Sequence, residues 1–212
     1  DSSSSTQGIV LHMNLLNNLL LITCKINLFD TLEFCYTFSM EEFKSQESIQ
    51  FSEIANEIIA MAEVDQRMRK MNLMNRDYWD DTIDPQNTER MKQIIDQIGW
   101  PTISKVGKKA STKAWLLVQH ADRDMEFQKQ CLLFMQEQPS DEINSGDIAY
   151  LTDRIKIHSG QPQIYGTQFK EVGGVHVPQD IEDPEGVDER RASMGLSTLA
   201  ENIEEINKKY KL

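Results

Sequence analysis

A Gln-His-Ala-Asp-Arg-Asp run at the end of a helical pattern holds the side chains best suited to proton transfer. A histidine exchanges protons near neutral pH, and a neighbouring carboxylate can orient its ring. The run therefore predicts an acid/base site with His120 as the base, Asp122 and Asp124 as orienting carboxylates and Gln119 as a ligand contact. The structural alternative is that His120 favours the helix C-terminus while either aspartate caps the next helix.

A second group of polar side chains lies between residues 153 and 168. Here the apolar spacing changes to two and predicts a strand over 163–172, which sends Gln163, Tyr165 and Thr167 to one face. A row of neutral hydrogen-bonding groups suits an uncharged polar ligand such as an amide, a sugar or a peptide backbone. The predicted ligand-binding residues of this group are Asp153, Arg154, His158, Gln163, Tyr165, Thr167 and Gln168. The alternative is a solvent-facing hairpin surface.

We expect His120 and this polar row to share one site, because buried polar groups must find partners. Two functions fit such a site. The first is a small hydrolase or transferase that uses His120 on a polar small molecule or peptide. The second is a non-catalytic module that binds a peptide or a protein partner through the same polar face or the hairpin. An enzyme should place both groups in one concavity, whereas a scaffold should place them apart.

Other catalytic and metal-binding motifs are missing from the sequence. The acidic loop over 72–86 lacks the ordered spacing of a calcium loop, and the four histidines lie far apart, unlike zinc ligands. We find no glycine-rich phosphate loop, GxSxG elbow, HExxH motif or dinucleotide fingerprint. We therefore expect neither a metal ion nor a cofactor.

Charge and composition restrict the partners further. The chain has 34 acidic and 22 basic residues and a formal charge of -12, so its average field repels a phosphate backbone and excludes nucleic acid as the expected partner. Asparagines and charged residues interrupt the apolar segment 9–38, so no membrane span is expected. The three cysteines lack paired spacing, which favours reduced thiols and a cytoplasmic location. An export signal ending at Cys24 remains the alternative, although its basic start is missing.

The remaining patterns predict a mainly α fold: a compact helical domain of about six or seven helices with one small antiparallel β-hairpin near the C-terminus. Gly99 should end one helix, and Ser197 should cap the last one. The Gly173-Gly174 pair predicts a two-residue hairpin loop with positive φ. Residues 1–39 are predicted to be an accessory arm, a tag or a non-native segment, and residues 40–212 a single helical domain.

Several short motifs occur in a consistent order between residues 99 and 184. They are Gly-Trp-Pro at 99–101, Trp-Leu-Leu-Val-Gln-His-Ala-Asp at 115–122, Tyr-Leu-Thr-Asp-Arg at 150–154, Pro-Gln-Ile-Tyr-Gly-Thr-Gln at 162–168 and Glu-Asp-Pro at 182–184. Together they resemble the bacterial domain of unknown function 6624 over about residues 53–205. The family carries no assigned activity, so the resemblance implies domain boundaries and no mechanism.

Overall fold

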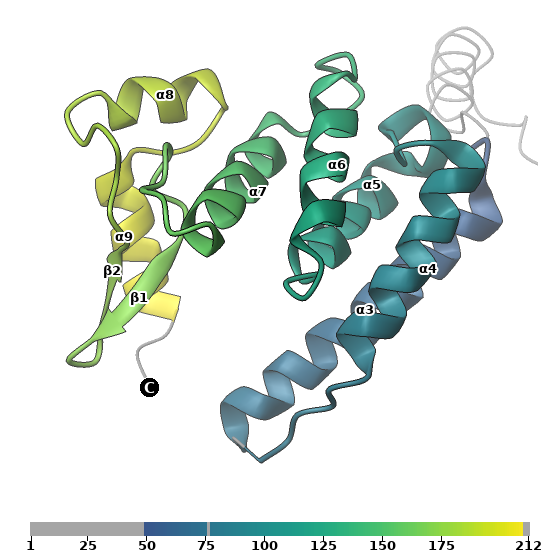
Figure 1. Cartoon of the computed structure of the whole chain (residues 1–212), viewed down its shortest axis with the longest axis horizontal. Coiled ribbons are helices and arrows are strands. Elements are labelled where there is room, and N and C mark those ends of the chain that lie inside the picture. Colours follow the sequence, from purple (N-terminus) through teal and green to yellow (C-terminus); the bar gives the residue numbers. More distant parts are fainter. Residues whose placement is uncertain (1–48, 76, 210–212) are drawn as a thin grey trace, which may run out of the picture. The chain divides into compact units, whose positions relative to one another are not determined.

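The structure is a computed structural model that describes residues 49–75 and 77–209. These residues belong to one unit that begins at Ile49, and the predicted boundary between residues 39 and 40 lies outside them. Within the described part, seven helices and one two-stranded sheet confirm the predicted mainly α fold (Figure 1). The elements are α3 (Ser52–Met74), α4 (Ile83–Ile98), α5 (Ile103–Gln119), α6 (Met125–Gln136), α7 (Ser145–His158), β1 (Phe169–Val172), β2 (Val175–Pro178), α8 (Val187–Ser193) and α9 (Leu199–Lys209).

Helices α3, α4 and α5 pack against one another and form the core beneath the candidate site. Each carries apolar residues at three- and four-residue spacing, and Ile58, Met91 and Leu117 are almost completely buried. Gly99 ends α4 as predicted, with φ at 69° and its N–H donating to the carbonyl of Ile95. This packing brings together the middle of α3, the first turn of α4 and the end of α5.

A short turn after α5 reverses the chain into α6, which packs on both α5 and α7. Asp124 caps α6, because its carboxylate accepts a hydrogen bond from the backbone N–H of Phe127 at 3.0 Å. Cys131 and Met135 on α6 are completely buried. The turn that carries His120 is therefore held between two packed helices.

The C-terminal hairpin has the predicted loop and register. Gly173 and Gly174 have φ values of 61° and 80°, which residues other than glycine rarely adopt. Glu171 pairs with His176 across the ladder, and the register is antiparallel throughout. Asn207 of α9 exchanges hydrogen bonds with the backbone of His176, so α9 supports β2.

Two local predictions are wrong. The predicted strand over 163–172 is ordered as a strand only at Phe169–Val172, because residues 163–168 wrap around the carboxylate of Asp153 instead. Thr198 rather than Ser197 caps α9, since Thr198 and Glu201 exchange side-chain to backbone hydrogen bonds in a capping box.

Candidate functional site

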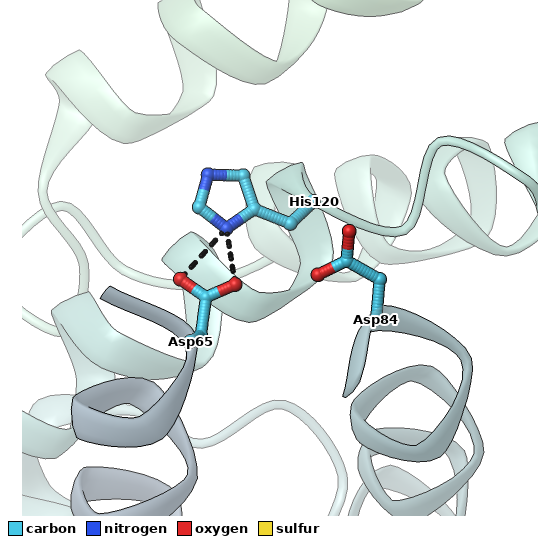
Figure 2. Close-up of side chains that lie close together, drawn as sticks. All are labelled: Asp65, Asp84 and His120. Carbon is cyan, nitrogen blue, oxygen red and sulfur yellow. Dashed lines mark hydrogen bonds and ion pairs between the residues drawn. The ribbon is translucent and has the colours of Figure 1, made fainter. Parts of the chain in front are cut away.

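Three polar side chains that are distant in the sequence meet where α3, α4 and the end of α5 come together (Figure 2). Asp65 projects from α3, Asp84 from the first turn of α4, and His120 directly follows α5. One potential ligand atom from each residue lies within 4.8 Å of those of the other two. The packed helices therefore create a polar cluster that no single segment of the chain contains.

The imidazole of His120 is held through one of its two ring nitrogens. Its Nδ1 lies 2.9 Å from Oδ1 and 3.1 Å from Oδ2 of Asp65. A neutral imidazole beside a carboxylate keeps its hydrogen on the nitrogen that faces the carboxylate, so Nδ1–H donates to Asp65. The other nitrogen, Nε2, points away from Asp65 in Figure 2 and has no hydrogen-bond partner among residues 49–75 and 77–209. Neutral His120 thus offers a free proton acceptor.

Asp65 is completely buried, and its charge is balanced by its neighbours. Burial is the largest influence and raises the pKa of Asp65, but hydrogen bonds from His120 and Gln66, the charge of Arg69 and the charge that His120 carries when it is protonated together lower this pKa below its usual value. The side-chain amide of Gln66 donates to Oδ2 at 2.8 Å. Asp65 is therefore an ionised carboxylate with fixed orientation.

Arg69, one helical turn after Asp65, connects the cluster. Its Nε lies 3.1 Å from Oδ1 of Asp65, and its terminal nitrogen donates to Oδ1 of Asp84 at 2.7 Å. The same Nε is 3.1 Å from Nδ1 of His120, but a protonated Nδ1 cannot accept, so this donor serves Asp65. The guanidinium also lies over the ring of Trp79, with its carbon 5.1 Å from the ring centroid.

Asp65, Asp84 and His120 are residue types that could hold a divalent cation. Arg69 already lies within hydrogen-bond distance of all three and supplies positive charge to both carboxylates. Burial raises the pKa of Asp84, and Asp65 raises it further, while the charge of Arg69 opposes both effects. A metal ion would have to displace the guanidinium before it could bind here.

A cavity of about 390 Å³ opens beside His120. Its walls come from α4, the preceding loop and the turn between α5 and α6, and Trp79, Thr88 and Ala121 contribute to them. This volume is within the range of sites that bind small molecules. His120 is therefore the member of the histidine–aspartate pair that a ligand in the cavity can reach, since its side chain is 14% exposed and that of Asp65 is not exposed.

The two aspartates predicted to orient His120 line the same cavity but have other partners. Asp122 accepts from Nε of Arg154 at 2.7 Å, and Asp124 pairs with Lys92 at 2.8 Å in addition to capping α6. Burial raises the pKa of Asp122, but hydrogen bonding and charge from Arg154 outweigh it and lower this pKa. The carboxylate that holds His120 is Asp65.

Asp153 and the loop over residues 163–168 form hydrogen bonds to one another. The buried carboxylate of Asp153 accepts from the backbone N–H groups of Ile164, Tyr165 and Thr167 at 2.7, 3.0 and 2.9 Å, and from the Thr167 hydroxyl at 2.9 Å. The side chain of Gln163 is buried and donates to backbone carbonyls of Gln168 and Gln179. These groups satisfy one another and do not line the His120 cavity.

The other predicted ligand contacts lie around this loop or beneath the turn. Arg154 contacts Asp122 and, at 3.4 Å, the side-chain oxygen of Gln168, and Nδ1 of His158 is 3.5 Å from Oδ1 of Asp122. Gln119 is buried, and its side-chain oxygen has no partner among the described residues. Neither Tyr165 nor the rest of the row lines the cavity beside His120, so the predicted shared site is divided.

Asp65 and Arg69 were not predicted from the sequence. The position of Asp65 in the sequence could have identified it. Asp65 follows Met61 by four residues and precedes Met68 by three, so it lies on the apolar face of α3. A charged residue at a core-facing position must be paired or neutralised. Arg69 at the i+4 position supplies one partner, but only the packed helices reveal His120 as the other.

A family model described as Family of unknown function (DUF6624) matches residues 52–212. The chain belongs to this family. The DUF6624 match begins at the first residue of α3 and includes the whole His120 site. No curated protein and no solved structure matches the chain. Among the described residues of this DUF6624 member, no helix has the length and apolar character needed to cross a membrane.

Proposed function

We propose that this DUF6624 protein is a hydrolase or transferase in which His120 acts as general base and general acid on a polar small molecule. The observation that supports the proposal is the hydrogen bond between Nδ1 of His120 and the buried carboxylate of Asp65, with the imidazole at the wall of a cavity. A base must be oriented by one ring nitrogen while the other remains free for the substrate. This pair meets both conditions.

The proposed proton transfer uses Nε2 of His120. Nε2 accepts a proton from a water molecule or substrate hydroxyl as that oxygen attacks an electrophilic centre in the substrate. The carboxylate of Asp65 stabilises the resulting imidazolium through the Nδ1–H bond, as acidic partners of catalytic histidines do. Nε2 then returns the proton to the leaving group, which restores neutral His120.

The nucleophile in this proposal is water or a substrate group. The thiol of Cys131 is the only cysteine side chain in the described part of the chain, and it is completely buried. Burial raises the pKa of Cys131 to about 12, so it stays a thiol at neutral pH. His120 is therefore assigned to proton transfer and not to the activation of a cysteine.

Turnover of model substrates tests the assignment. Nitrophenyl esters, phosphates and glycosides would be offered to the full chain, with glycerol as an alternative acceptor to water. We expect at least one class to be turned over, and His120→Asn to lower the rate about 100-fold or more, the usual contribution of general acid/base catalysis. Asp65→Asn should also lower the rate, because the ring loses its orienting carboxylate.

His176→Asn is the matched control, since His176 lies in β2 and does not line the cavity. It should retain the parental rate. A substrate-independent measurement adds to this comparison: diethyl pyrocarbonate should acylate His120 faster in the parent than in Asp65→Asn, as followed by peptide mass spectrometry. Equal turnover by the parent and His120→Asn for every substrate class would refute the catalytic role.

The second candidate is a non-catalytic module for a peptide or protein partner. The observation that favours it is the exposed tip of the hairpin, where Val172 and Val175 are 56% and 50% exposed. An extended peptide can add to the edge of such a two-stranded sheet through backbone hydrogen bonds. Selection from a displayed peptide library, with loss of binding in a Val172→Lys, Val175→Lys double variant, would support this function instead of catalysis.

A further inference from the structure

The walls of the His120 cavity carry more negative than positive groups. Carboxylates outnumber lysine and arginine side chains by five to two among the lining residues. The two cations are Lys92 and Arg123, and the formal charge of the whole chain is -12. When Arg69 and Arg154, which pair with Asp84 and Asp122 from outside the lining, are counted as well, one carboxylate remains in excess, so the local field favours cations over anions.

Both cationic side chains of the wall already have an acidic partner. Lys92 is 2.8 Å from Asp124, and Arg123 is 3.0 Å from Asp81. An anionic ligand would have to compete with these carboxylates for the same two positive charges. The cavity is consequently poor in positive charge that a phosphate or carboxylate ligand could use.

One acidic side chain of the wall remains without an ion pair. Asp84 pairs with Arg69 and Asp122 pairs with Arg154, and neither arginine lines the cavity. Glu89, by contrast, has no salt bridge with any residue that the structure describes. The charge of Glu89 acts on Lys92 without forming such a contact. A positively charged ligand could therefore bind at Glu89 without breaking an existing ion pair.

The cavity wall also carries an exposed aromatic ring, that of Trp79. Trp79 lines the cavity and is 43% exposed, and the guanidinium of Arg69 lies over its ring. Tryptophan is the aromatic residue that interacts best with cations. The Arg69 contact shows that a cationic nitrogen group is compatible with this ring and the neighbouring carboxylates.

We infer that the substrate of this cavity is a small molecule carrying an ammonium or guanidinium group, which Glu89 and Trp79 recognise while His120 acts on another part of the molecule. The inference rests on the proposed function, because it assigns a substrate class to the same site. The charged nitrogen serves recognition and takes no part in bond breaking.

Three small molecules of equal length and different charge provide the test: 1,4-diaminobutane, 1,4-butanediol and succinate. Binding to the full chain would be followed through the indole N–H resonance of Trp79, with the buried Trp100 and the partly buried Trp115 as internal references. We expect the diamine alone to shift the Trp79 resonance. Raising NaCl from about 50 to about 500 mM should weaken the effect, because salt screens exposed charges.

Glu89→Gln should weaken diamine binding about threefold to fivefold, the range expected for an exposed charge pair. Glu204→Gln on the exposed face of α9 is the matched control and should bind like the parent. Succinate binding, equal binding of all three compounds, no diamine binding, or equal effects of the two glutamate variants would each overturn the inference.

The diamine experiment is repeated with His120→Asn to separate the two proposals. We expect the variant to retain diamine binding, because Glu89 and Trp79 are unchanged. If this variant and the parent both bind the diamine but turn over every substrate class equally, the catalytic proposal fails while the ligand class stands. If the diamine does not bind but turnover depends on His120, only the substrate class is wrong.

Discussion

Nδ1 of His120 lies 2.9 Å from Oδ1 of Asp65, although 55 positions separate the two residues in the chain. The pair joins the middle of α3 to the turn after α5, and its carboxylate is completely buried. A buried carboxylate fixes the position and tautomer of a histidine more firmly than an exposed one, because water does not compete for the hydrogen bond and the low local dielectric strengthens it.

Replacing Asp65 with Asn should change the tautomer of His120. The amide carries no charge, so it loses much of its preference for a protonated Nδ1, and the ring becomes free to protonate Nε2. We expect the imidazole ¹⁵N shifts to change from the Nδ1–H pattern toward the Nε2–H pattern. The free energy of unfolding should fall by about 1–3 kcal/mol, as for loss of a hydrogen bond to a charged group. Asp141→Asn at an exposed position is the control, and unchanged ring shifts in Asp65→Asn would contradict the assignment.

Arg69 should prevent metal binding at the three-residue cluster. The parent protein is expected to show no saturable binding of Zn²⁺ or Mn²⁺ by isothermal titration calorimetry, because the guanidinium contacts Asp65, Asp84 and His120. Arg69→Ala removes that cation and leaves two carboxylates and an imidazole near one another, so it should gain a site for Zn²⁺. Adding Asp84→Asn to Arg69→Ala should remove the gain. Tight Zn²⁺ binding by the parent would show that Arg69 moves aside.

Asp153 should stabilise the loop over residues 163–168. Asp153→Asn presents an amide N–H to donors that need an acceptor, so the free energy of unfolding should fall by about 3 kcal/mol or more, since each unsatisfied buried group costs about 1–3 kcal/mol. Thr167→Val removes only one donor and should cost about 1 kcal/mol. Hydrogen exchange at Ile164 and Tyr165 should accelerate in Asp153→Asn, and parental exchange rates there would disprove the role.

Asp147 should make the protein less stable as the pH rises from about 4 to 7. Burial raises the pKa of Asp147 from 3.8 to about 7, although a hydrogen bond from Asn144 opposes the shift. Between these values the unfolded chain has lost the Asp147 proton while the folded protein retains it, so rising pH favours unfolding, and the effect levels off above pH 7. Asp147→Asn mimics the neutral carboxyl and should remove this loss, which amounts to at most about 4 kcal/mol.

Urea unfolding of the parent and Asp147→Asn at pH 4, 5.5 and 7.5 measures the difference. The advantage of the variant should grow across this series. Asp141→Asn, at an exposed position, should show no such trend. A constant difference between parent and Asp147→Asn at all three pH values would mean that Asp147 titrates normally.

Residues 1–39 should be dispensable for folding of the remainder. The apolar spacing in this segment is interrupted by polar residues, and the described helices build their core from Ile54 onward. A protein comprising residues 40–212 should therefore melt cooperatively, with a midpoint close to that of the full chain, in differential scanning calorimetry. Loss of the cooperative transition would show that the N-terminal segment completes the core.

The sequence by itself determined the local structure with good accuracy. Three- and four-residue apolar spacing predicts the helices, and Gly99 and the Gly173-Gly174 pair mark a helix end and a hairpin loop that the structure confirms. These features depend on backbone conformation and on neighbours within a few positions, so they can be read along the chain. The segment at 163–168 was misread because the period of two there comes from a loop whose N–H groups meet Asp153, a partner ten or more positions away.

His120 was proposed as a site residue from the sequence, because its residue type and its place after a helix are local properties. Its partner was not. Asp122 and Asp124 are close in sequence, but Arg154 and Lys92 attract their carboxylates, and the packing of α3 against α5 brings Asp65 to the imidazole instead. Only the tertiary structure could show which carboxylate pairs with His120. The partner of a charged or polar side chain depends on which groups lie close to it and on how far water is excluded around them, and the number of residues between two groups in the sequence determines neither.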